Sequence, residues 1–228
     1  MKGYKAILFD LDGTLVDSVT QLTFGINALM QSVRMRPFNI EEISRMIGKG
    51  VRVLLERVCE ARGIFPTEAT LTSMQRQYQR YVRELDPSSV HFFPGALESI
   101  REMRCMGLRT VLVTNKSREM TMDFVQKHAL AELFDHIYTA DDVRQPKPNG
   151  EMLRKACCDL GCNPDEALMV GDSRNDALAA RDAGTDVVLV QTGYNEGVPI
   201  EQWARDNGFA NVQKDVPAVW VWLKTHNA

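Results

Sequence analysis

Five short runs of aliphatic and β-branched residues constrain the fold of this chain more than any other feature. Each run is bounded by turn-forming residues and is continuous rather than alternating, which is typical of strands buried on both faces of a parallel sheet. The five predicted strands are residues 6–9, 110–113, 136–139, 167–170 and 187–190. Helical patterns at about 95–106, 117–129, 150–161 and 174–183 separate the later runs. This alternation predicts right-handed crossovers and a doubly wound α/β sheet.

Residues 18–92 interrupt the alternation. Apolar residues recur there at helical spacing in three groups, beginning at Val19, Val51 and Leu71, and no convincing strand lies among them. We therefore expect an all-helical cap domain at 18–92, inserted between the first strand and its crossover helix. An α/β core would then comprise residues 1–17 and 93–228, and both junctions would lie at the mouth of the sheet.

Polar residues follow four of the five predicted strands, and parallel strands share one carboxyl edge where open α/β sheets bind ligands. We therefore expect a common site at that edge. Its candidate residues, in chain order, are Asp10, Asp12, Thr114, Asn115, Lys147, Asp172 and Asp176.

Two acids follow the first strand and two follow the fourth, so these strands are expected to be neighbours with a cation between them. Asp10 and Asp12 repel each other, and a hard cation offsets that repulsion. Carboxylates with water suit Mg²⁺, and no His or Cys is placed to recruit zinc. Cys157, Cys158 and Cys162 fall in a helical pattern without paired CxxC units, which favours helix packing over a metal site.

A carboxylate beside Mg²⁺, with a Thr hydroxyl and a Lys nearby, is typical of phosphoryl transfer through an aspartyl-phosphate. In such a reaction one carboxylate attacks phosphorus, and a second acid protonates the leaving alkoxide and later takes a proton from water. Thr114, Asn115 and Lys147 would donate hydrogen bonds to the phosphoryl oxygens.

The chain resembles the haloacid dehalogenase-type phosphatases. Four motifs carry the resemblance, in order: "DLDGT", "VTNKS", "KP" and "GDSRND". The resemblance implies Asp10 as nucleophile and Asp12 as acid/base. It also implies Mg²⁺ held by Asp10, Asp172 and the backbone carbonyl of Asp12, with Asp176 supporting the metal through water. The implied order of the five predicted strands is 5-4-1-2-3.

Within that family the chain is most similar to the bacterial phosphoglycolate phosphatases, through "IGKGVRVLLER", "VTNK", "VGDSRNDALAARDAG" and the late "TGYNEG". The third motif departs from the usual Lys-Pro-x-Pro, because Gly150 ends "KPNG". The resemblance implies a small phosphorylated carboxylic acid as substrate, most simply 2-phosphoglycolate. Lys49 and Arg52 of the cap loop are the candidates for contacting its carboxylate.

Other functions fit less well. Asp12 argues against a dehalogenase and against a phosphonate hydrolase, because neither needs a second acid at this position. The pattern of the phosphosugar mutases has a histidine where this chain has Leu22. A phosphatase acting on a sugar phosphate is the main alternative. A receiver-like signalling domain would need no helical cap, and a phosphate-binding regulator would not need an intact acid pair.

Composition excludes other classes of protein. The net charge of -3 predicts no nucleic-acid binding, and no apolar stretch is long enough for a membrane span. Five cysteines without disulfide-like spacing are typical of a cytoplasmic protein. The sequence gives no clear dimer signal, so the chain is expected to be a monomer or a homodimer.

Overall fold

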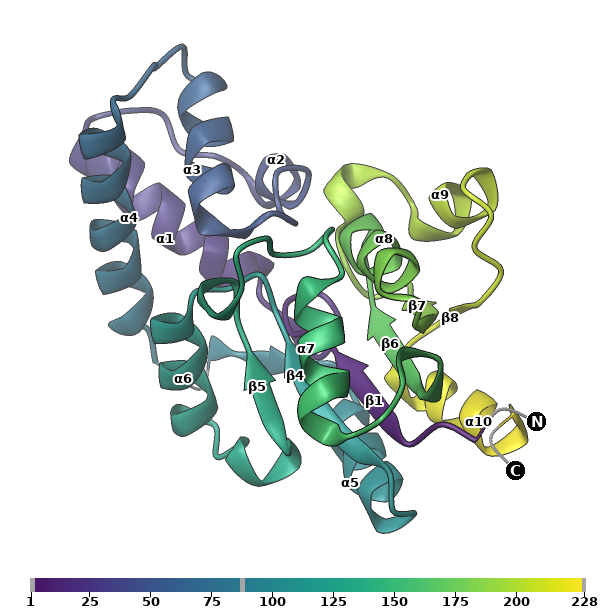
Figure 1. The fold of residues 1–228 in the computed structure, drawn as a ribbon. Coiled ribbons are helices and arrows are strands. Elements are labelled where there is room, and N and C mark those ends of the chain that lie inside the picture. The colour runs from purple at the N-terminus through teal and green to yellow at the C-terminus, as the bar shows by residue number, and fades with distance from the viewer. Residues whose placement is uncertain (1–2, 87–88, 227–228) are drawn as a thin grey trace.

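A six-stranded parallel sheet forms the centre of the molecule (Figure 1), seen in a computed structural model that describes residues 3–86 and 89–226. The strand order is β5-β4-β1-β6-β7-β8. The bounds are β1 Ala6–Phe9, β4 Arg109–Val113, β5 His136–Tyr138, β6 Ala167–Gly171, β7 Asp186–Val190 and β8 Val212–Gln213. All five pairings are parallel, with β1 hydrogen-bonded to β4 on one side and to β6 on the other.

The doubly wound fold and its strand order are confirmed. Numbered along the chain, the five predicted strands lie in the order 3-2-1-4-5, which is the predicted order 5-4-1-2-3 read from the opposite edge of the sheet. Each predicted range agrees with the observed strand to within one residue at either end. The sixth strand, β8, pairs outside β7 and was not predicted. The central position of β1 places Asp10 in the middle of the carboxyl edge.

The helices are α1 Val19–Ser32, α2 Ile40–Ser44, α3 Gly50–Glu60, α4 Glu68–Arg83, α5 Ala96–Cys105, α6 Arg118–Lys127, α7 Glu151–Leu160, α8 Arg174–Ala183, α9 Ile200–Asp206 and α10 Val216–His226. Short 3-10 turns lie at Ala131–Leu133, Ala140–Asp142, Pro164–Glu166 and Asn195–Gly197. The four helices predicted for the α/β core correspond to α5 to α8, whereas α9 and α10 were not predicted.

Both faces of the sheet are covered, because successive side chains of a strand point to opposite sides. From β1, Ile7 and Phe9 pack in one apolar cluster with α5, α6 and α10, while Ala6 and Leu8 pack in a second cluster with α7 and α8. In Figure 1, α7 lies in front of the strands and α5 behind them. This two-sided burial is the physical reason that the strands read as continuous apolar runs.

The inserted segment carries α1 to α4, which share an apolar cluster of their own that includes Ile26, Leu55 and Tyr78. The prediction of a segment without strands is wrong at its last two residues, since β3 His91–Phe92 pairs antiparallel with β2 Val16–Asp17. This ribbon brings the two junctions of the insert side by side. The division into two domains at 17/18 and 92/93 stays a prediction.

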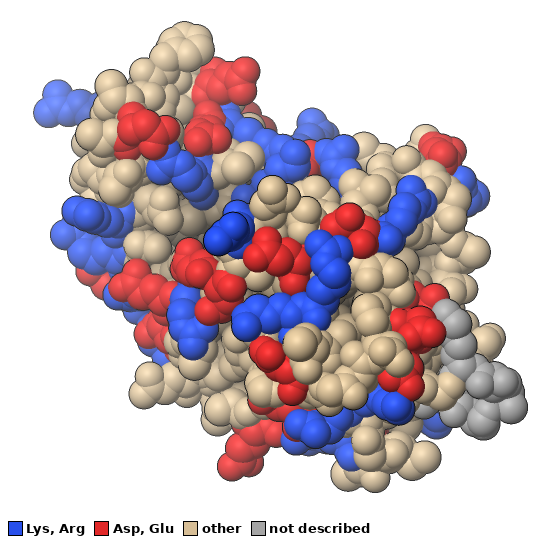
Figure 2. Space-filling model, viewed as in Figure 1, with Lys and Arg blue, Asp and Glu red and all other residues tan. Residues whose placement is uncertain are grey.

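The surface carries charges of both signs. Figure 2 shows Lys and Arg interspersed with Asp and Glu over the face in view. Among the helices of the described residues, none is both long and apolar enough to span a membrane.

Candidate active site

A cavity lies where the carboxyl edge of the sheet faces the inserted helices. Its floor includes Asp10, Thr114 and Asp172, which follow β1, β4 and β6. Its opposite wall comes from the insert and has an apolar part, formed by Leu22, Ile47, Val51, Leu54, Tyr78 and Val82. Ser18, Gln21, Gly48 and Gly50 of the insert also line the cavity.

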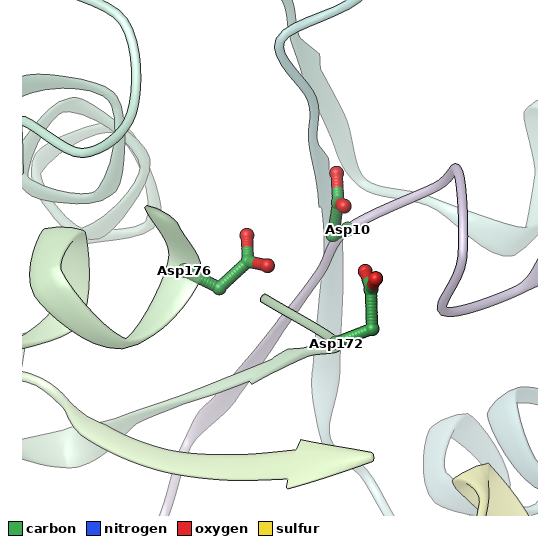
Figure 3. Close-up of side chains that lie close together, drawn as sticks. All are labelled: Asp10, Asp172 and Asp176. Carbon is green, nitrogen blue, oxygen red and sulfur yellow. The ribbon is translucent and has the colours of Figure 1, made fainter. Parts of the chain in front are cut away.

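Three buried carboxylates converge on the floor of this cavity (Figure 3). Oxygens of Asp10, Asp172 and Asp176 all lie within 4.8 Å of one another. Asp10 and Asp172 come from strand ends, and Asp176 comes from the first turn of α8. The pKa of Asp10 is raised to about 7, mainly by burial. The charge of Lys147 lowers this pKa and the charge of Asp176 raises it. Burial also raises the pKa of Asp172, and the charges of Asp176 and Asp10 raise it further.

This group of acids could hold a metal ion. Its donors are all carboxylate oxygens, which Mg²⁺ and Ca²⁺ prefer over nitrogen or sulfur. Repulsion among the three acids is only partly compensated by one lysine, so the residues fit a divalent cation.

Lys147 joins two of the three acids. Its Nζ lies 2.8 Å from Asp10 Oδ1 and 2.6 Å from Asp176 Oδ1, and it also donates to the carbonyl of Val113 at 2.8 Å. Burial alone would lower the pKa of Lys147, but the charges of Asp10 and Asp176 raise it above its usual value. The ammonium group is therefore charged and fixes one oxygen of Asp10.

Asp176 has a second role at the start of α8. Its Oδ2 accepts hydrogen bonds from the backbone N–H and the hydroxyl of Ser173, at 3.1 and 2.7 Å, in a capping box. One carboxylate oxygen thus caps the helix while the other binds Lys147. The capping and site roles of Asp176 are compatible.

Asp172 is held by two hydrogen bonds and lies close to the backbone of two glycines. Thr14 donates to Oδ1 at 3.1 Å, and the N–H of Tyr194 donates to Oδ2 at 3.0 Å. A Cβ at Gly193 would lie 1.7 Å from Asp172 Oδ2, and one at Gly13, where φ is +92°, would lie 2.5 Å from the same atom. Only glycine permits the chain to pass this close to Asp172 at both positions.

Asp12 lines the cavity but is outside the three-acid group. Lys116 Nζ lies 2.9 Å from each of its two carboxylate oxygens. The side chains of the pair are 17% and 21% exposed, so the ion pair is partly reachable from the cavity. The side chain of Asp12 is thus held by Lys116 and is separate from the three-acid group.

Thr114 and Asn115 differ in what their side chains do. Thr114 is 1% exposed and lines the cavity, where its hydroxyl accepts from the N–H of Lys116. The Asn115 amide instead clamps the backbone of Lys147, donating to its carbonyl at 2.8 Å and accepting from its N–H at 3.0 Å. In this structure Asn115 therefore positions the lysine. Its amide nitrogen has a second N–H and Asn115 lines the cavity, so its predicted hydrogen bond to a phosphoryl oxygen stays a prediction.

Lys49 and Arg52 do not line the cavity, although Gly48, Gly50 and Val51 of the same loop do. Lys49 is exposed, and Arg52 forms ion pairs with Glu56 and Glu68 on the surface of the insert. Neither residue therefore lies within the cavity in this arrangement of the insert, and their contact with a substrate carboxylate stays a prediction.

Sequence reasoning missed Lys116 and Tyr194, which both line the cavity. Lys116 follows Asn115 at the end of β4, and Tyr194 lies in the loop after β7. Both therefore belong to the same carboxyl edge as the predicted residues. That position was the available signal for them.

Comparison with known proteins gives consistent matches along the chain. A sequence profile of haloacid dehalogenase-like hydrolases matches residues 7–190. The phosphoglycolate phosphatase of Caulobacter vibrioides is 34% identical over 212 residues, covering 91% of this chain and 89% of that protein. Phosphoglycolate phosphatase 1 of Pseudomonas aeruginosa is 33% identical, covering 88% of this chain and 74% of that protein.

The fold is also shared with solved structures. The crystal structure of a predicted phosphoglycolate phosphatase from Haemophilus somnus superposes with a TM-score of 0.86 at 28% identity, covering 98% of each chain. The resemblance drawn from the four motifs is thereby confirmed.

Proposed function

The chain belongs to the haloacid dehalogenase-like hydrolase family, and we propose that it is a Mg²⁺-dependent phosphomonoesterase that hydrolyses 2-phosphoglycolate to glycolate and phosphate. The observation that carries the proposal is the meeting of Asp10, Asp12 and Lys147 with the other two acids in one cavity. A nucleophile, a separate proton donor and a fixed cation are the groups that phosphoryl transfer through an aspartyl-phosphate needs.

Mg²⁺ would be held by the carboxylates of Asp10 and Asp172 and the backbone carbonyl of Asp12, with Asp176 behind them. When bound, the ion supplies positive charge that reduces the repulsion between the attacking carboxylate and the phosphate. Two like charges at 4 Å repel by about 4 kcal/mol at an effective dielectric of 20, so this compensation matters to the barrier.

In the first step Asp10 attacks phosphorus. Lys147 holds Oδ1 of Asp10 at 2.8 Å, which leaves Oδ2 as the attacking oxygen. The bond between phosphorus and the bridging oxygen breaks, and protonated Asp12 donates its proton to the leaving alkoxide. The hydroxyl of Thr114 is buried on the same floor and can donate to a phosphoryl oxygen.

In the second step Asp12 acts as a base. It takes a proton from a water molecule, the water oxygen attacks phosphorus, and the bond between phosphorus and Asp10 breaks. Asp12 ends protonated and Asp10 ends as a carboxylate, so the pair is ready for another turnover.

The apolar wall supports a short substrate. A sugar phosphate would place several hydroxyls against Leu22, Val51 and Leu54, where they would lose hydrogen bonds to water. A two-carbon acid keeps its polar atoms near the polar floor. The names of the relatives from Caulobacter vibrioides and Pseudomonas aeruginosa support the same substrate.

A sugar-phosphate phosphatase and, less so, a phosphosugar mutase are the alternative functions. Leu22, where the mutase pattern has a histidine, lines the cavity and offers no proton donor. Assaying phosphoglycolate beside several sugar phosphates separates these functions, and faster turnover of a sugar phosphate would overturn the assignment.

The test of the mechanism is Asp10→Asn. The amide is nearly isosteric but is not a nucleophile, so turnover should fall by roughly a thousandfold or more while the fold is kept. Phosphate release with para-nitrophenyl phosphate and phosphoglycolate measures the loss, and circular dichroism checks folding. Asp165→Asn changes an exposed carboxylate outside the cavity and is the matched control. Near-normal activity in Asp10→Asn would refute the mechanism.

A further inference from the structure

The cavity contains one cation that the catalytic steps leave unused. Lys147 and Lys116 are the two basic residues among the described residues that line it. Lys147 is committed to Asp10 and Asp176, with its side chain only 2% exposed. Lys116 faces the cavity beside Asp12 and is therefore the positive charge that an entering anion would meet there.

The position of Lys116 matches the shape of the proposed substrate. In phosphoglycolate one methylene separates the bridging oxygen from the carboxylate. A cation that binds this carboxylate must therefore lie close to the group that protonates the bridging oxygen, which is Asp12. Lys116 Nζ lies 2.9 Å from both oxygens of Asp12. An ammonium group has three N–H donors, so it can hold Asp12 and still donate to a second carboxylate.

Two hydroxyls in the same cavity lack partners. The side-chain oxygens of Ser18 and Ser117 are buried without a hydrogen-bond partner in the described part of the chain. Each serine is the N-cap of a helix, α1 and α6, yet neither side chain makes a capping bond. A buried hydroxyl without a partner costs free energy, which a ligand carboxylate near it would recover. Ser117 directly follows Lys116, so the two side chains are adjacent in the chain.

We infer that Lys116, with Ser117 beside it, is the specificity-determining site for the substrate carboxylate, in place of Lys49 and Arg52. The inference rests on the proposed function. It predicts that Lys116 distinguishes a charged two-carbon phosphomonoester from an uncharged one of the same shape.

The experiment compares phosphoglycolate with phosphoglycolamide, which keeps the skeleton but has no carboxylate. Wild type, Lys116→Met and Lys116→Arg are assayed on both substrates with Mg²⁺. Lys116→Met should lower kcat/KM for phosphoglycolate relative to the amide by roughly tenfold to a hundredfold, the effect of losing a charged hydrogen bond. Lys116→Arg should recover part of the preference, and Ser117→Ala should lower it by a smaller factor.

Binding without turnover gives a second measurement. In the Asp10→Asn background, calorimetric titration with each compound should show the same loss of preference when Lys116→Met is added. This readout is independent of any effect of Lys116 on proton transfer by Asp12.

Three controls locate the effect. Lys155→Met removes a lysine that pairs with Asp159 outside the cavity and should leave the preference unchanged. Lys49→Met and Arg52→Met should do the same. Equal losses on both substrates in Lys116→Met, or a change of preference in Lys49→Met or Arg52→Met instead, would overturn the inference. If the wild-type enzyme hydrolyses sugar phosphates but not phosphoglycolate, the proposed function itself would be refuted.

Discussion

Close contacts with two residues of the loop after β7 set the position of Asp172. Position 193 requires glycine, because an added Cβ would lie 1.7 Å from Asp172 Oδ2. The adjacent N–H of Tyr194 holds the same oxygen at 3.0 Å. A displacement of this loop would therefore move a predicted metal ligand directly.

Gly193→Ala is accordingly expected to weaken Mg²⁺ binding at least tenfold, roughly the cost of disturbing an outer contact of a metal ligand. Titration of activity with Mg²⁺ and calorimetry of Mg²⁺ binding both measure the change. Gly3→Ala is the matched control, since a Cβ there meets nothing within 4 Å. Unchanged Mg²⁺ affinity in Gly193→Ala would contradict a ligand role for Asp172.

The acids and Lys147 could be placed in one site from the sequence because each follows a strand of a parallel sheet, either at the strand end or in the loop or helix that comes next. Their hydrogen-bond partners could not be predicted. Asn115 and Lys116 are neighbours after β4, yet one clamps the backbone of Lys147 and the other pairs with Asp12. These choices depend on the path of a loop in three dimensions, which residue spacing does not encode.

At the scale of elements, Asp135 joins α5 to the sheet. It lies in the turn before β5, where Arg104 of α5 and Arg109 of β4 each reach it at 2.9 Å. The N–H of Thr110 also donates to it at 2.9 Å. Although burial opposes the change, the hydrogen bonds from Thr110 and Arg104 hold the pKa of Asp135 below its usual value of 3.8.

Asp135→Asn should therefore lower the free energy of unfolding by about 1–3 kcal/mol at pH 7, the value of hydrogen bonds to a charged group. Since the pKa is lowered in the folded protein, the stabilisation is complete above the unfolded pKa and is lost as pH falls through the folded one. The difference in free energy of unfolding between wild type and variant should therefore decrease at pH values below the usual pKa of 3.8.

Urea unfolding at pH 7 and at about pH 3 measures this pH dependence. Glu132→Gln, an exposed acid in the same turn, should change stability by less than about 0.5 kcal/mol at either pH. A gap of equal size at both pH values would show that Asp135 acts through packing rather than charge.

Elements with a repeating pattern were predictable, and very short ones were not. The strands β2, β3 and β8 have two residues each, too few to show alternation. α10 was missed because its segment reads VPAVWVWLKTH, an almost continuous apolar run with a proline near its start. Such a run shows no helical period, so packing against α5 and the sheet decides its structure.

At the scale of the whole molecule, the loop "TGYNEG" after β7 makes hydrogen bonds to both the sheet edge and the first junction of the insert. Tyr194 holds Asp172 with its N–H, while its hydroxyl donates to Asp17 at 2.6 Å and accepts from the N–H of Val19 at 3.0 Å. Asp17 and Val19 are at the first junction of the insert. We propose that residues 18–92 act as a mobile cap hinged near 17–18 and 90–93, so that this loop couples the metal ligand to the hinge.

Glu196 of that loop also joins the two parts of the molecule. Its carboxylate pairs with Arg174 of α8 and, at 3.2 Å, with Arg57 of α3 in the insert. Beside it, Asn175 donates to the carbonyl of Gly48 at 3.0 Å. These contacts hold the insert over the acids, in the arrangement that would exclude water from the cavity while the aspartyl-phosphate forms.

Glu196→Gln should therefore favour the open arrangement of the cap. Hydrogen exchange at amides around Gly48 and Val51 should become about threefold to tenfold faster, because the partly buried ion pairs are worth up to about 1 kcal/mol each. If closure is needed for turnover, kcat/KM should fall by a similar factor. Glu68→Gln is the matched control, since its partner Arg52 is also on the insert and the pair does not cross to the sheet. Equal exchange in both variants and the wild type, with activity unchanged, would mean that Glu196 does not hold the cap closed.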